Sequence, residues 1–211
     1  MRREELIAEV VAEFETISAG MERWPDPHPT GEILDEEYSR TTNPARFRII
    51  GARCEAWLKV LVDRGLCSVE RDVEVVWADP PSIATSGQDR AVPSVVEALP
   101  LVVRRTQHAV LGDFGVRLGI GSPVEHLGAM PRCGCDACDG GSEYELDEVD
   151  RAFFVVVSGA LRRLTRQDRL ITVEDNGWSA SGRFDRGEVE TILADSTGWA
   201  EVSGAPWGVG G

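Results

Sequence analysis

Two stretches in the first third of the chain repeat apolar residues every three or four positions, the period of an α-helix with one buried face. Residues 3–19 place glutamates between the apolar positions and are followed by Gly20, so we predict an amphipathic N-terminal helix. A second helix is predicted from Asn43, an N-cap residue before a proline, to about residue 64. The apolar positions are Leu6, Val10, Phe14 and Ile17 in the first helix and Phe47, Ile50, Cys54, Trp57, Leu58 and Leu61 in the second.

The same period recurs over residues 143–165 and predicts a further long helix. Ser142 and Glu145 form the S-x-x-E capping box that is typical of a helix start. Acidic residues fill the first turns and arginines fill the last, which is the arrangement that the helix dipole favours. The apolar positions of this helix are Leu146, Val149, Phe153, Val156, Val157, Ala160 and Leu164.

Alternation of apolar and polar residues predicts strands in the middle of the chain. Residues 69–77 alternate in this way, and residues 99–106 and 115–121 follow as two further strands. Residues 124–130 are expected to be another extended segment. The polar residues 82–91 are expected to form a loop.

Near the C-terminus, Asp175-Asn176-Gly177 lies between two short runs of strand character. Asn-Gly in this setting predicts a β-hairpin of residues 170–174 and 178–184. Asp185 and Glu188 repeat the capping-box pattern, which predicts a short last helix.

These elements predict an α+β fold, in which a mostly antiparallel sheet is packed by the two long helices. The N-terminal helix and a C-terminal hairpin-helix unit complete it. At 211 residues the chain is long enough for one sizeable core, and no break in composition divides it. We therefore expect a single domain over residues 1–211, with residues 1–20 and the Gly-rich tail at 200–211 as peripheral parts.

The charge balance narrows the classes of partner. The chain has 36 acidic against 22 basic residues and a net charge of −14, so we expect no nucleic-acid and no membrane partner, since both select clustered lysine and arginine. No run approaches the roughly 18 apolar residues of a membrane span, and the N-terminus lacks a secretory pattern. We expect a cytoplasmic protein, in which close cysteines are more often a metal site than a disulfide framework.

Three of the five cysteines, Cys133, Cys135 and Cys138, fall within six residues. Cys-x-Cys places two sulfurs on the same side of an extended segment, and Cys-x2-Cys is the spacing at which a tight turn brings two sulfurs to one ion. The string therefore predicts a structural Zn2+ site. Tetrahedral zinc requires a fourth ligand, and His126 on the neighbouring extended segment is the first candidate. Further candidates for the fourth position are Asp136, Asp139, His28, His108, Cys54 and Cys67.

Two other chemistries compete for the same cysteines. Cys135 and Cys138 precede a predicted helix, whose N-terminus would lower a thiol pKa as in thiol-redox sites. The flanking Asp136 and Asp139 would instead raise the thiol pKa values. Iron–sulfur binding normally requires a fourth cysteine, which this segment lacks. The sequence contains no H-E-x-x-H, G-x-S-x-G, Walker or G-x-G-x-x-G pattern.

We interpret the chain as a non-enzymatic binding or interaction protein, whose cysteine string holds a structural zinc ion that pins the sheet to the long helix. The alternative is a thiol-redox or metal-dependent enzyme that uses the same cysteines. The partner would be a protein or a small molecule. Residues 24–29 and the tryptophans of the tail offer a third interpretation, a groove for such a partner, although scattered tryptophans are more often plain packing.

Short motifs spread over nearly the whole chain form a recognisable set. They are Trp24-Pro25, His28-Pro29, Glu37-Tyr38-Ser39, the CGCDACD string at 133–139, Gly177-Trp178-Ser179-Ala180 and Gly198-Trp199. The set resembles an uncharacterised bacterial family of about this length, classed as a domain of unknown function, and the cysteine string is its most specific motif. The resemblance implies one domain and a cysteine string shared by the family. It implies no activity, ligand or catalytic residue.

Overall fold

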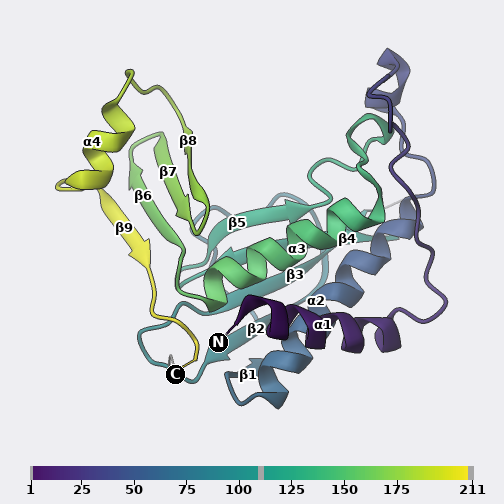
Figure 1. Ribbon diagram of the computed structural model, residues 1–211, viewed down its shortest axis with the longest axis horizontal. Helices are drawn as coiled ribbons and strands as arrows, with labels where there is room; N and C mark the ends of the chain where they lie inside the picture. Colours follow the sequence, from purple (N-terminus) through teal and green to yellow (C-terminus); the bar gives the residue numbers. More distant parts are fainter. Residues whose placement is uncertain (1, 109–111, 209–211) are drawn as a thin grey trace.

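The computed structural model describes residues 2–108 and 112–208, without the side chains of residues 108 and 113. Three long helices lie on one face of a five-stranded sheet, and a smaller four-stranded sheet with a short helix stands at one end (Figure 1). Because the strand pairs within both sheets are antiparallel, this arrangement confirms the predicted α+β fold. The side chain of His108, a candidate ligand from the sequence, lies outside the described part.

The three long helices bury the apolar faces that the sequence predicts. They are α1 (Arg3–Ile17), α2 (Arg48–Asp63) and α3 (Gly141–Val157). Their side chains share one core with the sheet. Its fully buried large residues include Leu6, Phe14, Trp57, Leu101, Leu118 and Phe153.

The larger sheet runs in chain order from β1 to β5. Its strands are β1 (Cys67–Glu70), β2 (Thr85–Pro93), β3 (Leu101–His108), β4 (Gly112–Ile120) and β5 (Glu125–Met130). The helices cover one face, and on the other face Trp77 packs against Val102 and Val124.

Two of the strand predictions are wrong. The predicted loop at 82–91 contains strand β2, and the predicted strand at 69–77 is regular only as far as Glu70. The polar sequence of β2 conceals a buried position, because Asp89 is 1% exposed and is paired with Arg71 and Arg105 at 3.0 and 2.6 Å. A strand whose buried charge is satisfied by ion pairs does not show the apolar alternation on which the prediction depended.

The smaller sheet has the order β8-β7-β6-β9. Its elements are β6 (Arg162–Arg166), β7 (Arg169–Glu174), β8 (Gly177–Ser181), α4 (Glu188–Ala194) and β9 (Ala200–Ser203). The pairing of β7 with β8 confirms the hairpin at Asn176-Gly177. This unit has a small core of its own, formed by Leu164, Ile171, Val189 and Ile192.

Helix α3 ends at Val157 and not near residue 165. Gly159 follows in the left-handed region at φ 70°, and a Cβ there would lie 2.6 Å from the backbone nitrogen of Pro206. The chain then turns into β6, so that Leu164 faces the core of the smaller sheet. The helical spacing of apolar residues in the sequence therefore continues past Val157, because Leu164 is the next buried residue although it lies on strand β6.

The predicted caps also differ from those in the structure. Ser142 does not cap α3, whose N-cap is Gly140, because its hydroxyl donates to the carbonyl oxygen of Trp24 at 3.0 Å. Asn43 adopts a left-handed conformation at φ 46°, makes no cap hydrogen bond and donates its side-chain amide to Glu22. Both residues connect distant segments instead.

The tryptophans of the tail take part in packing. Trp207 is 1% exposed in the main core and donates its indole N–H to the carbonyl oxygen of Leu99 at 3.1 Å. Trp199 stacks on Phe184 beside the smaller core. None of the helices in the described ranges combines the length and the apolar character needed to cross a membrane.

Candidate metal centre

The three cysteines of the string lie together on the loop that joins β5 to α3. The sulfurs of Cys133, Cys135 and Cys138 all lie within 4.8 Å of one another, and those of Cys133 and Cys135 are 3.0 Å apart. All three are free thiols. With Zn–S bonds of about 2.3 Å, tetrahedral geometry separates two sulfurs by about 3.8 Å, so the group needs only a small spreading to surround one ion.

A glycine and a short turn give the loop its shape. Gly134 lies in the left-handed region at φ 82°, and a Cβ there would come within 2.0 Å of the Phe114 ring. The 3-10 turn η3 (Asp136–Cys138) follows, and the amide of Cys138 donates to the carbonyl oxygen of Cys135 at 3.1 Å. The turn brings the last cysteine back toward the first two.

The thiols differ in how readily they ionise. Burial opposes ionisation of Cys135, but hydrogen bonds from the thiols of Cys133 and Cys138 outweigh it and lower the pKa of Cys135. The same contacts with Cys133 and Cys135 raise the pKa of Cys138 to about 12. The pKa of Cys135 is thus set mainly by burial and by the other two thiols, and the effect expected of the neighbouring aspartates is not among its main causes. Ionisation is therefore favoured at Cys135 and opposed at Cys138, and a bound cation would favour the thiolate form of both.

Asp136 is buried although cysteines lie on either side of it in the loop. Its carboxylate accepts hydrogen bonds from the amide and hydroxyl of Thr42 and from Arg40 Nε, each at 2.7 Å. Burial raises its pKa, but the bonds from Thr42 and Arg40 outweigh burial and hold the pKa of Asp136 below its usual range. Its oxygens are therefore already occupied by other partners.

Asp139 is enclosed still more fully, with a side chain that is 0% exposed. Its carboxylate accepts hydrogen bonds from the indole N–H of Trp24, at 2.8 and 3.0 Å to its two oxygens, and from the amide of Gly141 at 2.9 Å. It also forms an ion pair with Arg46. These contacts tie the loop to the segment before α2 and to the start of α3.

An aromatic cluster supports this anchor. Phe47 meets Trp24 and Phe114 edge to face, with ring centres 5.6 and 5.4 Å apart. The guanidinium of Arg46 lies over Trp24 and Phe47, 5.2 and 5.0 Å from the ring centres. The residues that hold Asp139 are thus fixed in turn by packing.

The structure does not bring the other candidate ligands with described side chains into the group. Among the described side chains, only the three cysteines gather closely enough to hold a metal, and His126 is exposed on β5 outside that group. His28 lies 3.2 Å from Glu37. Cys54 and Cys67 are buried elsewhere, and burial raises the pKa of each, that of Cys67 to about 11.

A cavity of about 840 Å3 adjoins the group, between β5, α3 and the end of β7. Cys138, His126 and Glu145 all line it. Glu145 is only 4% exposed, and burial, with Asp139 and Glu148 nearby, raises its pKa to about 7. Sequence reasoning interpreted Glu145 as half of a capping box and did not identify it as a site residue.

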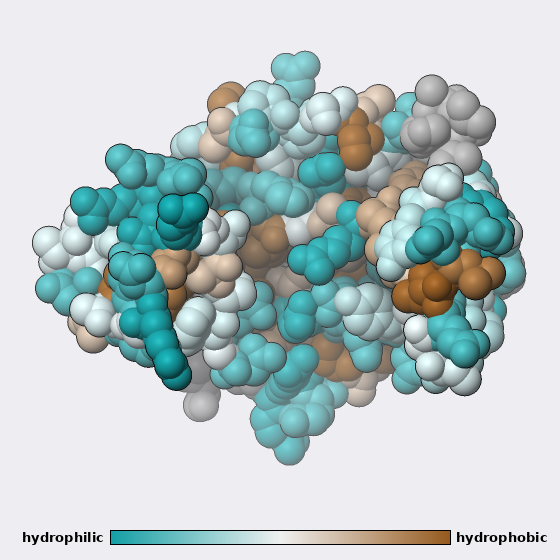
Figure 2. Space-filling view, turned by 90° about the horizontal axis from the view of Figure 1, so that it is seen from above, coloured by the Kyte–Doolittle hydropathy of each residue, from teal (hydrophilic) through white to brown (hydrophobic). Residues whose placement is uncertain are grey.

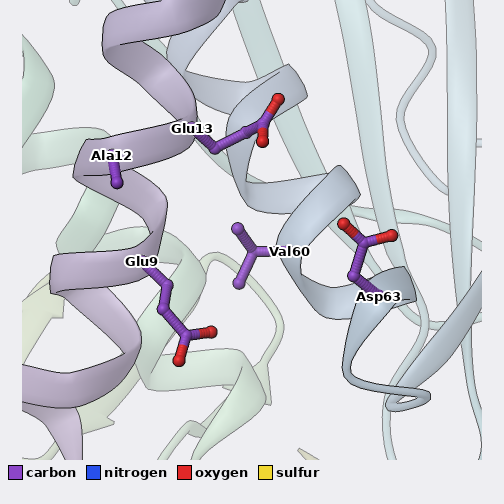
Figure 3. Close-up of a pocket in the computed structure, with 5 residues that line it drawn as sticks. All are labelled: Glu9, Ala12, Glu13, Val60 and Asp63. Atoms are coloured by element: carbon purple, nitrogen blue, oxygen red, sulfur yellow. The ribbon is translucent and has the colours of Figure 1, made fainter.

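The remaining surface has weaker features. Hydrophilic side chains cover most of the view from above, which is hollowed between two protruding ends, and apolar ones form small separate groups (Figure 2). A smaller cavity of about 320 Å3 between α1 and α2 is lined by Glu9, Glu13 and Asp63 (Figure 3). Glu9 is paired with Arg64, and Lys59 contacts the other two carboxylates, so each carboxylate already has a cationic partner.

Comparison with known proteins gives one match. The sequence model of a family of unknown function, DUF6226, matches residues 10–209. This confirms the resemblance to a family of unknown function that is about 200 residues long. No curated protein and no solved structure matches the chain.

Proposed function

The chain belongs to DUF6226, a family of unknown function, and we propose that it is a non-enzymatic binding protein whose cysteine loop holds a Zn2+ ion. Cys133, Cys135 and Cys138 supply three thiolates to the ion. The observation that carries this proposal is the convergence of three sulfurs within 4.8 Å on a loop of six residues.

The anchoring of the loop supports metal binding. Asp136 and Asp139 fix the loop through contacts that involve none of the sulfurs. The loop therefore needs no metal to keep its shape, and a site that is held in place before the ion arrives loses less conformational entropy on binding. Zinc is the proposed ion because thiolate ligands in a near-tetrahedral arrangement favour it over Mg2+ or Ca2+.

The fourth ligand is proposed to come from outside the loop. The carboxylates of Asp136 and Asp139 are occupied, and Cys133 and Cys138 are exposed. Three protein ligands and an accessible face leave one position for solvent or for a bound molecule. His126 remains a candidate only if the loop moves toward β5.

Metal content and stability test the proposal together. Purified protein should contain about one zinc per chain, and a chelator should lower its melting temperature to the value of Cys135→Ser. Cys67→Ala is the matched control, since this thiol lies outside the group, and it should retain the metal. Equal melting curves for parent, chelated parent and Cys135→Ser, with no metal in any of them, would contradict the proposal.

A second candidate function is thiol-redox chemistry. It is supported by the distance of 3.0 Å between the sulfurs of Cys133 and Cys135, and the pKa of Cys135 is lowered as well. In a thiol-redox protein these two thiols would become a disulfide while a partner disulfide is reduced to two thiols. Alkylation distinguishes the candidates. A redox site should show one thiol that reacts quickly at neutral pH whether or not zinc is added, whereas a metal site should be protected until the metal is removed.

A further inference from the structure

The cavity beside the cysteine group is lined by charged side chains that have no part in the proposed zinc site. It lies between the edge strand β5, the first turns of α3 and Glu174 at the end of β7. Its volume of about 840 Å3 falls within the range of small-molecule sites. Cys138 is the member of the metal group that lines it, so a molecule in this space would lie next to the cysteine group.

Arginines give part of the wall a positive charge, in a protein whose net charge is −14. Arg117 has no ion-pair partner among the described side chains, and its Nε is buried without a hydrogen bond. Arg132 lines the same cavity. Although the residue is exposed, partial shielding of its imidazole from water lowers the pKa of His126, and the positive charges of Arg117 and Arg163 lower it further.

Glu145 is the buried acid of this cavity that has no partner among the described residues. It is only 4% exposed, and burial and nearby charges, with no hydrogen bond, set the pKa of its carboxyl. Because Glu145 lines the cavity, its carboxyl is open to a ligand or a solvent molecule that would supply the missing hydrogen bond. The charged groups that face it are Asp139, Glu148 and Arg46.

We propose that this cavity binds a small anionic molecule, which takes the open coordination position of the metal, lies against Arg117 and accepts a hydrogen bond from the neutral carboxyl of Glu145. The inference rests on the proposed metal site. An ionised Glu145 would repel the same anion. Binding is therefore linked to the protonation of Glu145 and weakens as this group ionises.

Cobalt-loaded protein with azide as the probe tests the inference. Co2+ at saturation replaces zinc and gives visible absorption that reports its ligands. If only the neutral carboxyl permits binding, the azide affinity of the parent should fall about tenfold between pH 6 and pH 8, because the neutral fraction falls by that factor around a pKa of about 7. Azide remains an anion throughout this range.

Two variants separate Glu145 from general effects of pH. Glu145→Gln keeps a neutral donor, so its azide affinity should change less than twofold over the same range. Glu174→Gln removes a carboxylate from the opposite wall of the cavity, and its azide affinity should keep the tenfold pH dependence of the parent. Competition from hydroxide would act equally on all three proteins and would persist in Glu145→Gln.

The possible results differ in what they overturn. An absorption spectrum that does not depend on the three cysteines would refute the metal site itself. Cobalt bound by the cysteines but unchanged by azide would refute the open position and leave the metal site standing. Azide binding with the same pH dependence in Glu145→Gln as in the parent would refute the role of Glu145.

Discussion

The two kinds of side chain in the loop at 133–139 are held in opposite ways. The carboxylates of Asp136 and Asp139 are buried, and each takes hydrogen bonds from residues in other segments. The sulfurs of Cys133 and Cys138 are exposed, and the three thiols contact one another. The buried side of the loop fixes its position, and the exposed side is available to bind an ion.

This difference changes the role proposed for the metal. From the sequence, an ion at the cysteines is expected to pin the sheet to the long helix. All three sulfurs belong to one loop, however, and the contacts that reach distant segments are those of the aspartates, up to 115 residues away in the chain. We therefore propose that the carboxylates stabilise the fold and that the sulfurs bind the metal ion.

The largest expected effect is on the buried side. Asp139→Ala removes a fully enclosed carboxylate and leaves Arg46 and the Trp24 indole without their partner. Breaking a buried ion pair in this way costs about 3–5 kcal/mol, and urea denaturation at neutral pH measures the loss. Asp136→Ala should cost less, because its partner Arg40 is 51% exposed. Equal stability of Asp139→Ala and the parent would contradict the claim that the buried carboxylates hold the loop in place.

A substitution at the bend between the two sides should have the next largest effect. Gly134→Ala places a Cβ against the Phe114 ring at a backbone angle that favours glycine. The clash and the backbone strain together predict a loss of about 2–4 kcal/mol in urea denaturation. Phe114→Ala in the same chain should remove the clash but not the strain, so the double variant should lose less than the sum of the two single ones.

Glu145 should show a pH-dependent gain in stability when it is neutralised. Its pKa in the folded protein, about 7, is raised above the ordinary value of 4.5, so the folded state keeps a proton that the unfolded state releases between these values. Stability of the parent therefore falls as pH rises through this window and stays lower above it. The difference in free energy of unfolding between Glu145→Gln and the parent should be about 1–3 kcal/mol more favourable to the variant at pH 8 than at pH 4. An unchanged difference at the two pH values would show that this carboxyl is not strained by burial.

The smallest effect is expected on the exposed side in the absence of metal. Cys135→Ser should change the stability of the metal-free protein by no more than about 0.5 kcal/mol, because substitutions away from buried contacts seldom do more. With zinc at 100 times its dissociation constant, the parent should gain about 2.7 kcal/mol and the variant should gain nothing. Thermal melts with and without a chelator measure both values. A large loss in the metal-free variant would mean that the sulfurs also hold the fold.

The sequence was sufficient for features that depend on neighbouring residues. The three sulfurs, the hairpin at Asn176-Gly177 and the helical faces with Phe14 and Phe153 are all local patterns, and each is present. The strand through Asp89 was missed because its buried charge is balanced by arginines from other segments.

The anchors of the loop were beyond the reach of the sequence for the same reason. Apart from the amide of Gly141, the partners of the two aspartates are Trp24, Arg40, Thr42 and Arg46, and nothing in the residues near either aspartate identifies these distant partners. Glu145 was similarly hidden, since its burial follows from how α3 packs against the loop and β5. Such charges can be recognised as site residues only after the segments have been placed.

X-ray absorption at the zinc edge of the protein loaded with one equivalent of zinc tests the central claim most directly. The account predicts three sulfur neighbours at about 2.3 Å and one nitrogen or oxygen neighbour at about 2.0–2.1 Å, with the sulfur shell reduced in Cys135→Ser. A zinc ion surrounded only by oxygen or nitrogen, or a protein that retains no zinc after desalting, would contradict it.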